Sequence, residues 1–474
     1  MIDRKEKMQL TRTEIILQVF TNVRAGEGYT ALLMFANVFL ILCAYYFVKP
    51  LREGWIAVSD ISGLTKMEVR AYSSFAQSIF LLFIVGWYGH LSFCWKRVTL
   101  ITRATLFCIS NMLIFWFLQP GFFIDRLPVS GIIFYLWVGM FGVFIVAQFW
   151  TFCADIYNDE RGKRLLPFIA IGGTSGAVAG SWLVDMLVDS GIIATEFLLI
   201  VATLPLFLSI KLTRIVDAQH RKETSVGGIS TNGEIPTLLP EKDIKSAMSS
   251  AKLIFLSRFV LFAALVTLLA NWVNTNGENL LFHVIQEVLA NQAAEQGIID
   301  PQKIIKFTRD GTTAFYGDFF FWVNVIALFL QSFVASRLLK LGGFGAILML
   351  LPVIALISYT TMALLPILVI VKIMKIAENA TDYSVNNTAR NVLWLPVNTT
   401  MKFLGKPAID TLYVRIGDGL AAITILVGVQ LLSLSTKQFF IFNVSLIVLW
   451  LICCVMLVME YNKASARNEL GRES

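Results

Sequence analysis

One apolar stretch of the sequence carries four charged residues at helical spacing. Lys372, Lys375, Glu378 and Asp382 follow one another at steps of three and four residues, so a helix places them near one face. A charge in the middle of a membrane-spanning helix costs at least about 2.5–3.5 kcal/mol, which makes such residues functional candidates. Two lysines in one stripe are typical of a site for an anion. The alternative is a structural ladder in which the lysines and acids only neutralise one another.

A second group of charges, Lys49, Arg52 and Glu53, follows the first apolar stretch. If the first span ends near residue 48, these side chains lie at the membrane rim and snorkel to water. If the span continues to about residue 57, they lie within the membrane and become candidates for binding. Both interpretations remain open from the sequence.

Acidic residues in or near other spans are candidates for ion-pair gates. Asp155 closes the fourth apolar stretch beside the basic loop 161–164, and Glu278 lies at the end of the seventh. An acid in such a place can hold a basic residue in one conformation and release it in another. The alternative for Asp155 is that it only neutralises the neighbouring loop.

The sequence contains no motif for enzyme chemistry, a cofactor or a metal. The glycine-rich turn followed by Gly-Lys-Ser/Thr is absent, as are HExxH, GxSxG and paired His–Cys ligands. Gly172, Gly173, Gly176 and Gly180 form a series of small residues that favours close helix packing. The six cysteines have no metal-ligand spacing and are expected to be small core residues. We therefore expect a protein that is not an enzyme and needs no cofactor.

The elements that must position these charges are membrane-spanning helices. The chain has 474 residues, of which 57% are hydrophobic and 15% charged, against about 25% charged in soluble proteins. The apolar residues fall in blocks of roughly 20, the length a helix needs to cross a bilayer. This pattern excludes a soluble enzyme, a disordered chain and a secreted disulfide scaffold. It predicts an all-α integral membrane protein with about twelve transmembrane helices, at 30–48, 71–93, 98–118, 131–153, 165–188, 192–212, 253–272, 313–337, 343–362, 364–386, 411–433 and 437–459.

Basic residues orient these spans. With both termini in the cytoplasm, the inner loops hold a roughly threefold excess of Lys and Arg over the outer loops, as the positive-inside rule requires. The net charge of +7 first reflects these loops. The outer loop 284–312 contains Asp300-Pro301, which predicts a short helix over 301–309 that serves as a connector or a lid. The predicted organisation is an amphipathic N-terminus (1–28), a six-helix half (29–212), a linker (213–250), a second six-helix half (251–460) and a tail (461–474).

The two halves resemble each other at equivalent spans. Residues 49–56 and 274–281, which end the first and seventh spans, each hold a polar cluster closed by Glu before apolar residues. Residues 155–167 and 382–396, which end the fourth and tenth spans, each run from Asp through basic residues to Leu-Pro. Repeated halves are common in transporters, whose substrate sites lie at the repeat interface. The matches predict a 6+6 architecture of the major facilitator type.

Four stretches make the chain resemble the non-mitochondrial ATP/ADP translocase (nucleotide transporter) family. They are Lys49-Pro-Leu-Arg52-Glu53, Gln148-Phe-Trp-Thr-Phe-Cys-Ala-Asp155, the tract from Lys375 through Asp382-Tyr-Ser to Arg390, and Lys406-Pro-Ala-Ile-Asp410. Their order and spacing extend through nearly the whole chain.

This resemblance implies exchange of nucleotides across a membrane, with basic residues holding the phosphates. Arg52 matches a basic site of the family's first span, Asp155 an acidic site of the fourth, and Lys406 a basic site before the eleventh. The chain departs from the family at Ala154, where Asn is usual. It also departs in the seventh span, where a lysine is missing from the stretch 272–278. These departures indicate a divergent member that transports nucleotides or another phosphorylated anion.

The predicted function is therefore alternating-access exchange of nucleotides or related anions. The predicted substrate-binding residues are the basic side chains Lys49, Arg52, Lys372, Lys375 and Lys406, with the aromatic rings of Tyr46 and Trp272 for a base. The predicted ion-pair partners are Glu53, Asp155, Glu278, Glu378 and Asp382. One alternative is a proton-coupled symporter or exporter of another small solute, in which Asp155, Glu278 or Glu378 carries the proton. A second alternative is a membrane protein that transports nothing, such as a scaffold or a membrane-embedded enzyme.

The expected partners follow from the same features. They are the lipid bilayer and a small anionic substrate, without nucleic acid. We expect a monomer in a bacterial inner membrane, with both termini in the cytoplasm.

Overall fold

The computed structural model describes residues 11–18, 21, 23–94, 97–120, 129–157, 159–226, 257–397, 405–406 and 409–473. Within these ranges the chain is helical and forms no strand. Residues 1–10 of the predicted N-terminal segment and residues 227–250 of the predicted linker lie outside the described residues.

The N-terminal half consists of one short helix and six long ones. They are α1 (Arg12–Leu17), α2 (Gly28–Ala57), α3 (Lys66–Cys94), α4 (Arg97–Phe117), α5 (Ser130–Ile156), α6 (Asp159–Asp189) and α7 (Leu198–Val226), with the 3-10 turn η1 (Thr195–Phe197) before α7. Because α2 continues to Ala57, Lys49, Arg52 and Glu53 lie inside the helix and are buried. The structure thus decides between the two interpretations of these charges.

The C-terminal half contains six further long segments, three of which include the four π-helical turns among the described residues. The elements are α9 (Arg258–Glu295), α10 (Pro301–Phe329), η2 (Leu330–Val334), α11 (Ala335–Leu364), α12 (Leu368–Thr381), η3 (Asp382–Asn386), α13 (Asn387–Val392), η4 (Ile409–Tyr413), α15 (Val414–Leu426), η5 (Val427–Leu431) and α16 (Thr436–Glu473). The six long helices of each half follow the order of the twelve predicted spans.

Nine helical stretches among the described residues are long and apolar enough to cross a membrane. One of them, Pro301–Leu364, runs through α10, η2 and α11, and the backbone is broken within α11 at Gly343, whose φ is 66°. The charge-bearing segments α3 and α12 are not among the nine. Both hold residues of the site described below.

The loop between α9 and α10 is shorter than predicted. The side chain of Asp300 accepts a hydrogen bond of 3.0 Å from the Gln302 amide, which confirms the predicted helix cap. The helix that follows does not end at residue 309 but continues to Phe329. The prediction of a separate short helix is therefore wrong.

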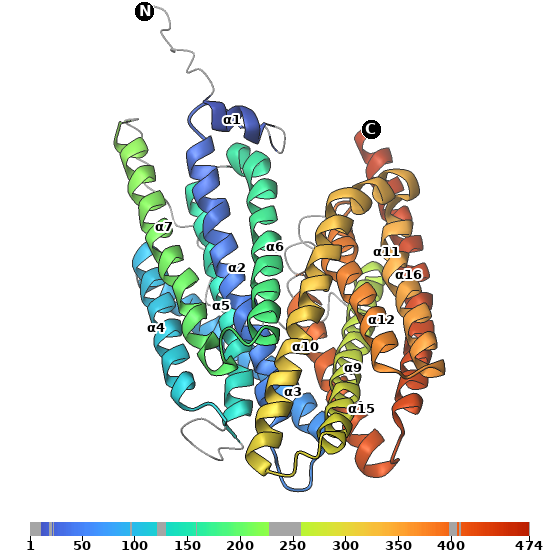
Figure 1. Cartoon of the computed structure of the whole chain (residues 1–474). Coiled ribbons are helices and arrows are strands. Elements are labelled where there is room, and N and C mark those ends of the chain that lie inside the picture. The colour runs from blue at the N-terminus through green and yellow to red at the C-terminus, as the bar shows by residue number, and fades with distance from the viewer. Residues whose placement is uncertain are drawn as a thin grey trace, which may run out of the picture.

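The two halves stand side by side, and both chain termini lie at the same end of the bundle, the terminal face (Figure 1). Contacts between the halves join α10 to α2 and α6, and α3 to α9 and α15. The helices of the two halves approach one another toward the opposite end, the distal face, and diverge toward the terminal face (Figure 1).

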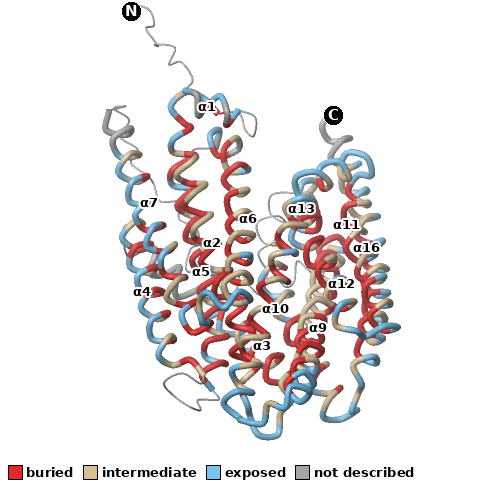
Figure 2. The backbone as a smooth tube through the Cα atoms, in the orientation of Figure 1, coloured by how far each residue is buried: buried red, intermediate tan, exposed pale blue. Residues whose placement is uncertain are grey.

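Burial follows this arrangement (Figure 2). Apolar side chains such as Phe83, Leu204 and Val369 are exposed by 74%, 61% and 61%, as expected for a surface that faces lipid. Inside the N-terminal half, the predicted close packing at small residues is present. A Cβ atom at Gly172 or Gly176 would collide with the backbone of α2.

Candidate functional site between the two halves

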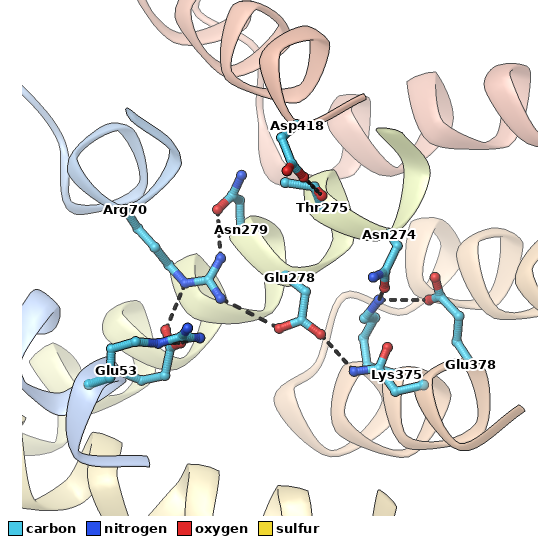
Figure 3. Close-up of polar contacts among 11 residues, drawn as sticks. Glu53, Arg70, Asn274, Thr275, Glu278, Asn279, Lys375, Glu378 and Asp418 are labelled. Atoms are coloured by element: carbon cyan, nitrogen blue, oxygen red, sulfur yellow. Dashed lines mark hydrogen bonds and ion pairs between the residues drawn. The ribbon is translucent and has the colours of Figure 1, made fainter. Parts of the chain in front are cut away.

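Charged side chains from both halves meet where α2 and α3 approach α9 and α12 (Figure 3). On α2, Arg52 donates a hydrogen bond from Nε to Glu53 Oε1 at 3.0 Å. On α3, Arg70 donates from Nε to Glu53 Oε2 at 2.8 Å. Glu53 is completely buried, and a carboxylate in that environment requires such charged partners.

Arg70 extends these bonds into the C-terminal half. Its Nη1 donates to Asn279 Oδ1 at 2.6 Å, and its Nη2 lies 3.5 Å from Glu278 Oε2. The other oxygen of Glu278 accepts a bond of 2.6 Å from Asn379 Nδ2 on α12. A continuous chain of bonds therefore joins the two halves. We call its members the central network: Arg52, Glu53, Arg70, Glu278, Asn279 and Asn379.

A second buried ion pair lies next to the central network on the C-terminal side (Figure 3). The completely buried Lys375 donates from Nζ to Glu378 Oε2 at 2.9 Å and to Asn274 Oδ1 at 3.2 Å. Gly277 makes room for this arrangement, because a Cβ there would lie 2.9 Å from Lys375 Nζ and would collide with the Tyr359 hydroxyl.

Lys49 differs from the other buried cations at this junction. Its Nζ lies over three aromatic rings, 3.9 Å from the centroid of Phe320, 5.1 Å from that of Tyr46 and 5.7 Å from that of Tyr383. It forms no ion pair or hydrogen bond with any residue in the described ranges, and the residue is 9% exposed. The rings stabilise the ammonium group by cation–π contacts, but its three donors remain available.

Two cavities lie on opposite sides of the central network along α2. The distal cavity, of about 430 Å³, is lined by Ala57 at the end of α2 and by Ala290 of α9. The proximal cavity, of about 210 Å³, lies toward the terminal face and is lined by Tyr46, Asn324 and Tyr383, among others. Eleven residues of helix, or about 16 Å, separate Tyr46 from Ala57. The central network occupies this interval and forms a barrier between the cavities.

A further polar contact ties α3 to α15. Asp418 accepts hydrogen bonds from Ser78 of α3, from Asn271 and Thr275 of α9, and from Arg415 of its own helix. The Asn271 and Thr275 bonds measure 2.7 and 3.0 Å. The buried carboxylate is thus surrounded by donors from both halves.

Ion pairs near the terminal face join residues within one half. Arg164 pairs with Glu27 at 2.8 Å in the N-terminal half, and Arg390 pairs with Asp410 at 2.7 Å in the C-terminal half. The bonds between the halves described above lie instead at mid-bundle or toward the distal face. The structure therefore has its two halves joined on the distal side.

Of the residues predicted from the sequence, seven converge on this junction: Tyr46, Lys49, Arg52, Glu53, Glu278, Lys375 and Glu378. Two others remain within the C-terminal half nearby. Lys372 pairs with Asp318, and Asp382 accepts a hydrogen bond of 2.7 Å from Asn386.

The three remaining predicted residues lie apart from the junction. Asp155 pairs with Arg97 at 2.8 Å and is largely accessible. Lys406 Nζ donates a hydrogen bond of 3.2 Å to Asn391 Oδ1 in an exposed position. Trp272 donates to the Thr424 hydroxyl at 2.9 Å, which directs its ring toward α15 rather than toward the other half.

The sequence interpretation missed Arg70 and three asparagines that form hydrogen bonds with the buried charges. Arg70 was expected in an outer loop, but it lies in α3 and is only 3% exposed. Asn274, Asn279 and Asn379 carried a usable signal, since an amide side chain inside an apolar span needs a polar partner.

Comparison with known proteins agrees with this architecture. The model of the TLC ATP/ADP transporter family matches residues 343–461, which include Lys375 and Glu378. Among solved structures, the POT family transporter PepTSo has a TM-score of 0.60 at 11% identity, over 92% of this chain and 98% of that chain. The D-xylose–proton symporter has a TM-score of 0.57 at 12% identity, over 90% and 96%. The nucleoside transporter NupG has a TM-score of 0.53 at 13% identity, over 90% and 99%. No curated protein matches the sequence significantly.

These findings confirm the predicted fold class and the resemblance to ATP/ADP transporters, the latter over the matched stretch. The chain has a fold of the major facilitator type and is a multi-pass integral membrane protein.

Proposed function

We propose that the protein exchanges nucleotides, in the manner of an ATP/ADP antiporter, or related phosphorylated anions, by alternating access. One observation carries this proposal. Lys49 presents an ammonium group without an anionic partner at the edge of a cavity that both halves line. A buried cation without a counter-charge is unfavourable. An anionic substrate bound there would supply that counter-charge and so stabilise the protein. The family match over residues 343–461 supports a nucleotide as that anion.

The central network supplies the link between binding and conformational change. A phosphate that reaches Lys49 also approaches Arg52, whose guanidinium is held by Glu53 and lies 4.4 Å from the ring of Tyr135. Phosphate oxygens compete with the carboxylates for these donors. Once Arg70 loses Glu53 or Glu278 as a partner, the bond between the halves weakens and the distal side can open.

This scheme favours exchange over one-way transport. Without substrate, the carboxylates rebind the arginines and hold the distal side closed. An incoming anion is needed to release them again. Lys375, Lys372 and Lys406 remain candidates for contact with the substrate in other conformations.

The proposed orientation places both termini in the cytoplasm of a bacterium, with the chain acting as a monomer in the inner membrane. The basic loops support this orientation. With this orientation the proximal cavity lies toward the cytoplasm, and the central network closes the outer side.

Uptake by proteoliposomes tests the proposal. Vesicles loaded with ADP and offered labelled ATP should accumulate label, whereas empty vesicles should not. Lys49→Gln should abolish most of this uptake, and Lys463→Gln, which removes an exposed lysine paired with Glu460, should not. Failure of every nucleotide and phosphorylated anion in a panel to exchange would refute the proposal.

A proton-coupled carrier is the second candidate, and one observation favours it. A cavity inside the C-terminal half is lined by Glu378, Asp382 and Arg390 among mostly apolar residues, so two carboxylates that could carry a proton face an internal space. In that case uptake would follow an imposed pH gradient and would not need a counter-substrate inside the vesicles.

A further inference from the structure

The proximal cavity lies next to the charged central network, but its own lining is uncharged. Its thirteen lining residues come from α2, α5, α6, α10, η2 and η3, and none of them is charged. The polar groups are hydroxyls and side-chain amides, and the remainder are aromatic or small apolar residues. A polyanion would find no counter-charge on these walls, so the cavity suits a neutral group.

Aromatic surface is available in this cavity. Trp150 of α5 and Tyr383 of η3 line it from opposite halves, and they keep 37% and 38% of their surface uncovered. Tyr46 contributes a third ring. Any flat heteroaromatic group can stack on such rings, because every nucleobase has a π-face. Each stacked base contributes substantially to binding.

One amide in the lining is free to recognise a ligand. Asn324 is held in place, because its Nδ2 donates to the Phe320 carbonyl at 2.7 Å. Gln331, in the π-helical turn η2, is exposed and forms no hydrogen bond with any residue that the structure describes. Its amide offers a donor and an acceptor side by side, the pair that reads the edge of a purine base.

Lys49 marks the boundary between this neutral cavity and the charged junction. Its ammonium group lies over Tyr46 and Tyr383, which both line the cavity. The site therefore changes from neutral and aromatic at Gln331 to cationic at Lys49 and Arg52. A nucleotide has the same polarity, with a flat neutral base at one end and phosphates at the other.

We infer that the proximal cavity is the subsite for the nucleobase, with Trp150 and Tyr383 stacking the ring and Gln331 reading its edge, while Lys49 holds the phosphates. This assignment rests on the proposed function and adds the orientation of the substrate, with its base in the proximal cavity and its phosphates toward Lys49. The volume agrees, since about 210 Å³ is below the range of about 300–1,000 Å³ of pockets that enclose a whole ligand. The sugar and phosphates then extend toward the central network.

Competition experiments test the assignment. Uptake of labelled ADP is measured against unlabelled ADP, GDP, CDP and UDP, which vary the base, and against adenosine, AMP and ATP, which vary the phosphates. Gln331→Leu should reduce the preference between bases by about three- to tenfold and leave the phosphate ranking unchanged. Lys49→Gln, for which the same competitors are compared by binding of labelled ADP to the purified protein, should do the reverse. Trp150→Leu should weaken all bases by about tenfold, and Trp182→Leu, which alters an exposed tryptophan outside the cavity, should have no effect.

The outcomes separate this inference from the proposed function. If nucleotides exchange but the Gln331 and Trp150 variants keep both the ranking and the affinity of the unaltered protein, the base does not bind here. If no nucleotide competes at all, the proposed function fails, and the base subsite fails with it. The Gln331 change lies on an exposed turn, so loss of folding is not expected to obscure the result.

Discussion

Arg70 Nη1 on α3 lies 2.6 Å from Asn279 Oδ1 on α9, and this hydrogen bond joins the two halves of the protein. The same guanidinium binds Glu53 in its own half at 2.8 Å. One side chain thus satisfies a buried carboxylate and bridges the halves. Its removal should affect both stability and the closure of the distal side.

Arg70→Gln should destabilise the protein by about 3–5 kcal/mol, because Glu53 loses one of its two charged partners while remaining buried. Adding Glu53→Gln should recover part of this loss, since no uncompensated carboxylate is left. The thermal unfolding midpoint of the purified single and double variants measures both effects. Purely additive losses would show that the two residues do not depend on each other.

Lys49→Gln should weaken ADP binding by roughly 10- to 100-fold, the effect of losing a charge-assisted hydrogen bond. Unlike Arg70, Lys49 has no ion-pair partner in the described structure, so its removal should leave the thermal midpoint unchanged or raise it. Binding and thermal unfolding measured on the same preparation distinguish the two effects. A lowered midpoint with unchanged affinity would contradict a role in binding.

Asp418→Asn should loosen the contact between α3 and α15, because the neutral amide cannot accept all the bonds that the carboxylate accepts and leaves Arg415 without its counter-charge. Ser78→Ala, which removes one donor, should cost only about 1 kcal/mol. Urea or thermal unfolding compares the two variants. Equal effects would indicate that the Ser78 bond alone joins these helices.

A cysteine in the proximal cavity should report substrate binding. In a variant without native cysteines, Thr174→Cys should react with a water-soluble maleimide, because Thr174 lines that cavity. ADP should slow the reaction. Lys437→Cys, at an exposed position in the first turn of α16, should react at the same rate with and without ADP. Protection at both positions would indicate a general change in the protein rather than occupation of the cavity.

The helices and much of the junction could be predicted from the sequence because burial in lipid constrains both. Apolar blocks must form helices, and charges such as Lys375 and Glu378 must find partners inside the bundle. The position of Lys49 depended on how far the first helix extends, which composition alone does not determine. In the structure α2 continues to Ala57, and Lys49 is buried within this helix.

The partners could not be predicted, because they depend on how the halves dock. Arg70 lies near the start of α3, where an arginine usually snorkels to water. It is buried only because α9 of the other half covers it. Likewise, nothing in the sequence near Asp418 indicates that Ser78, 340 residues away, donates to it.

The two sides of the junction carry opposite charge. The N-terminal half contributes Lys49, Arg52 and Arg70 against Glu53, and the C-terminal half contributes Lys375 against Glu278 and Glu378. If the halves rock as the proposed function requires, these charges move through the electric field of the membrane, where one elementary charge is worth about 2.3 kcal/mol per 100 mV. The proposed exchange should then depend on voltage when no substrate is bound. A bound polyanion would offset the positive side, so substrate and membrane potential would act on the same few side chains.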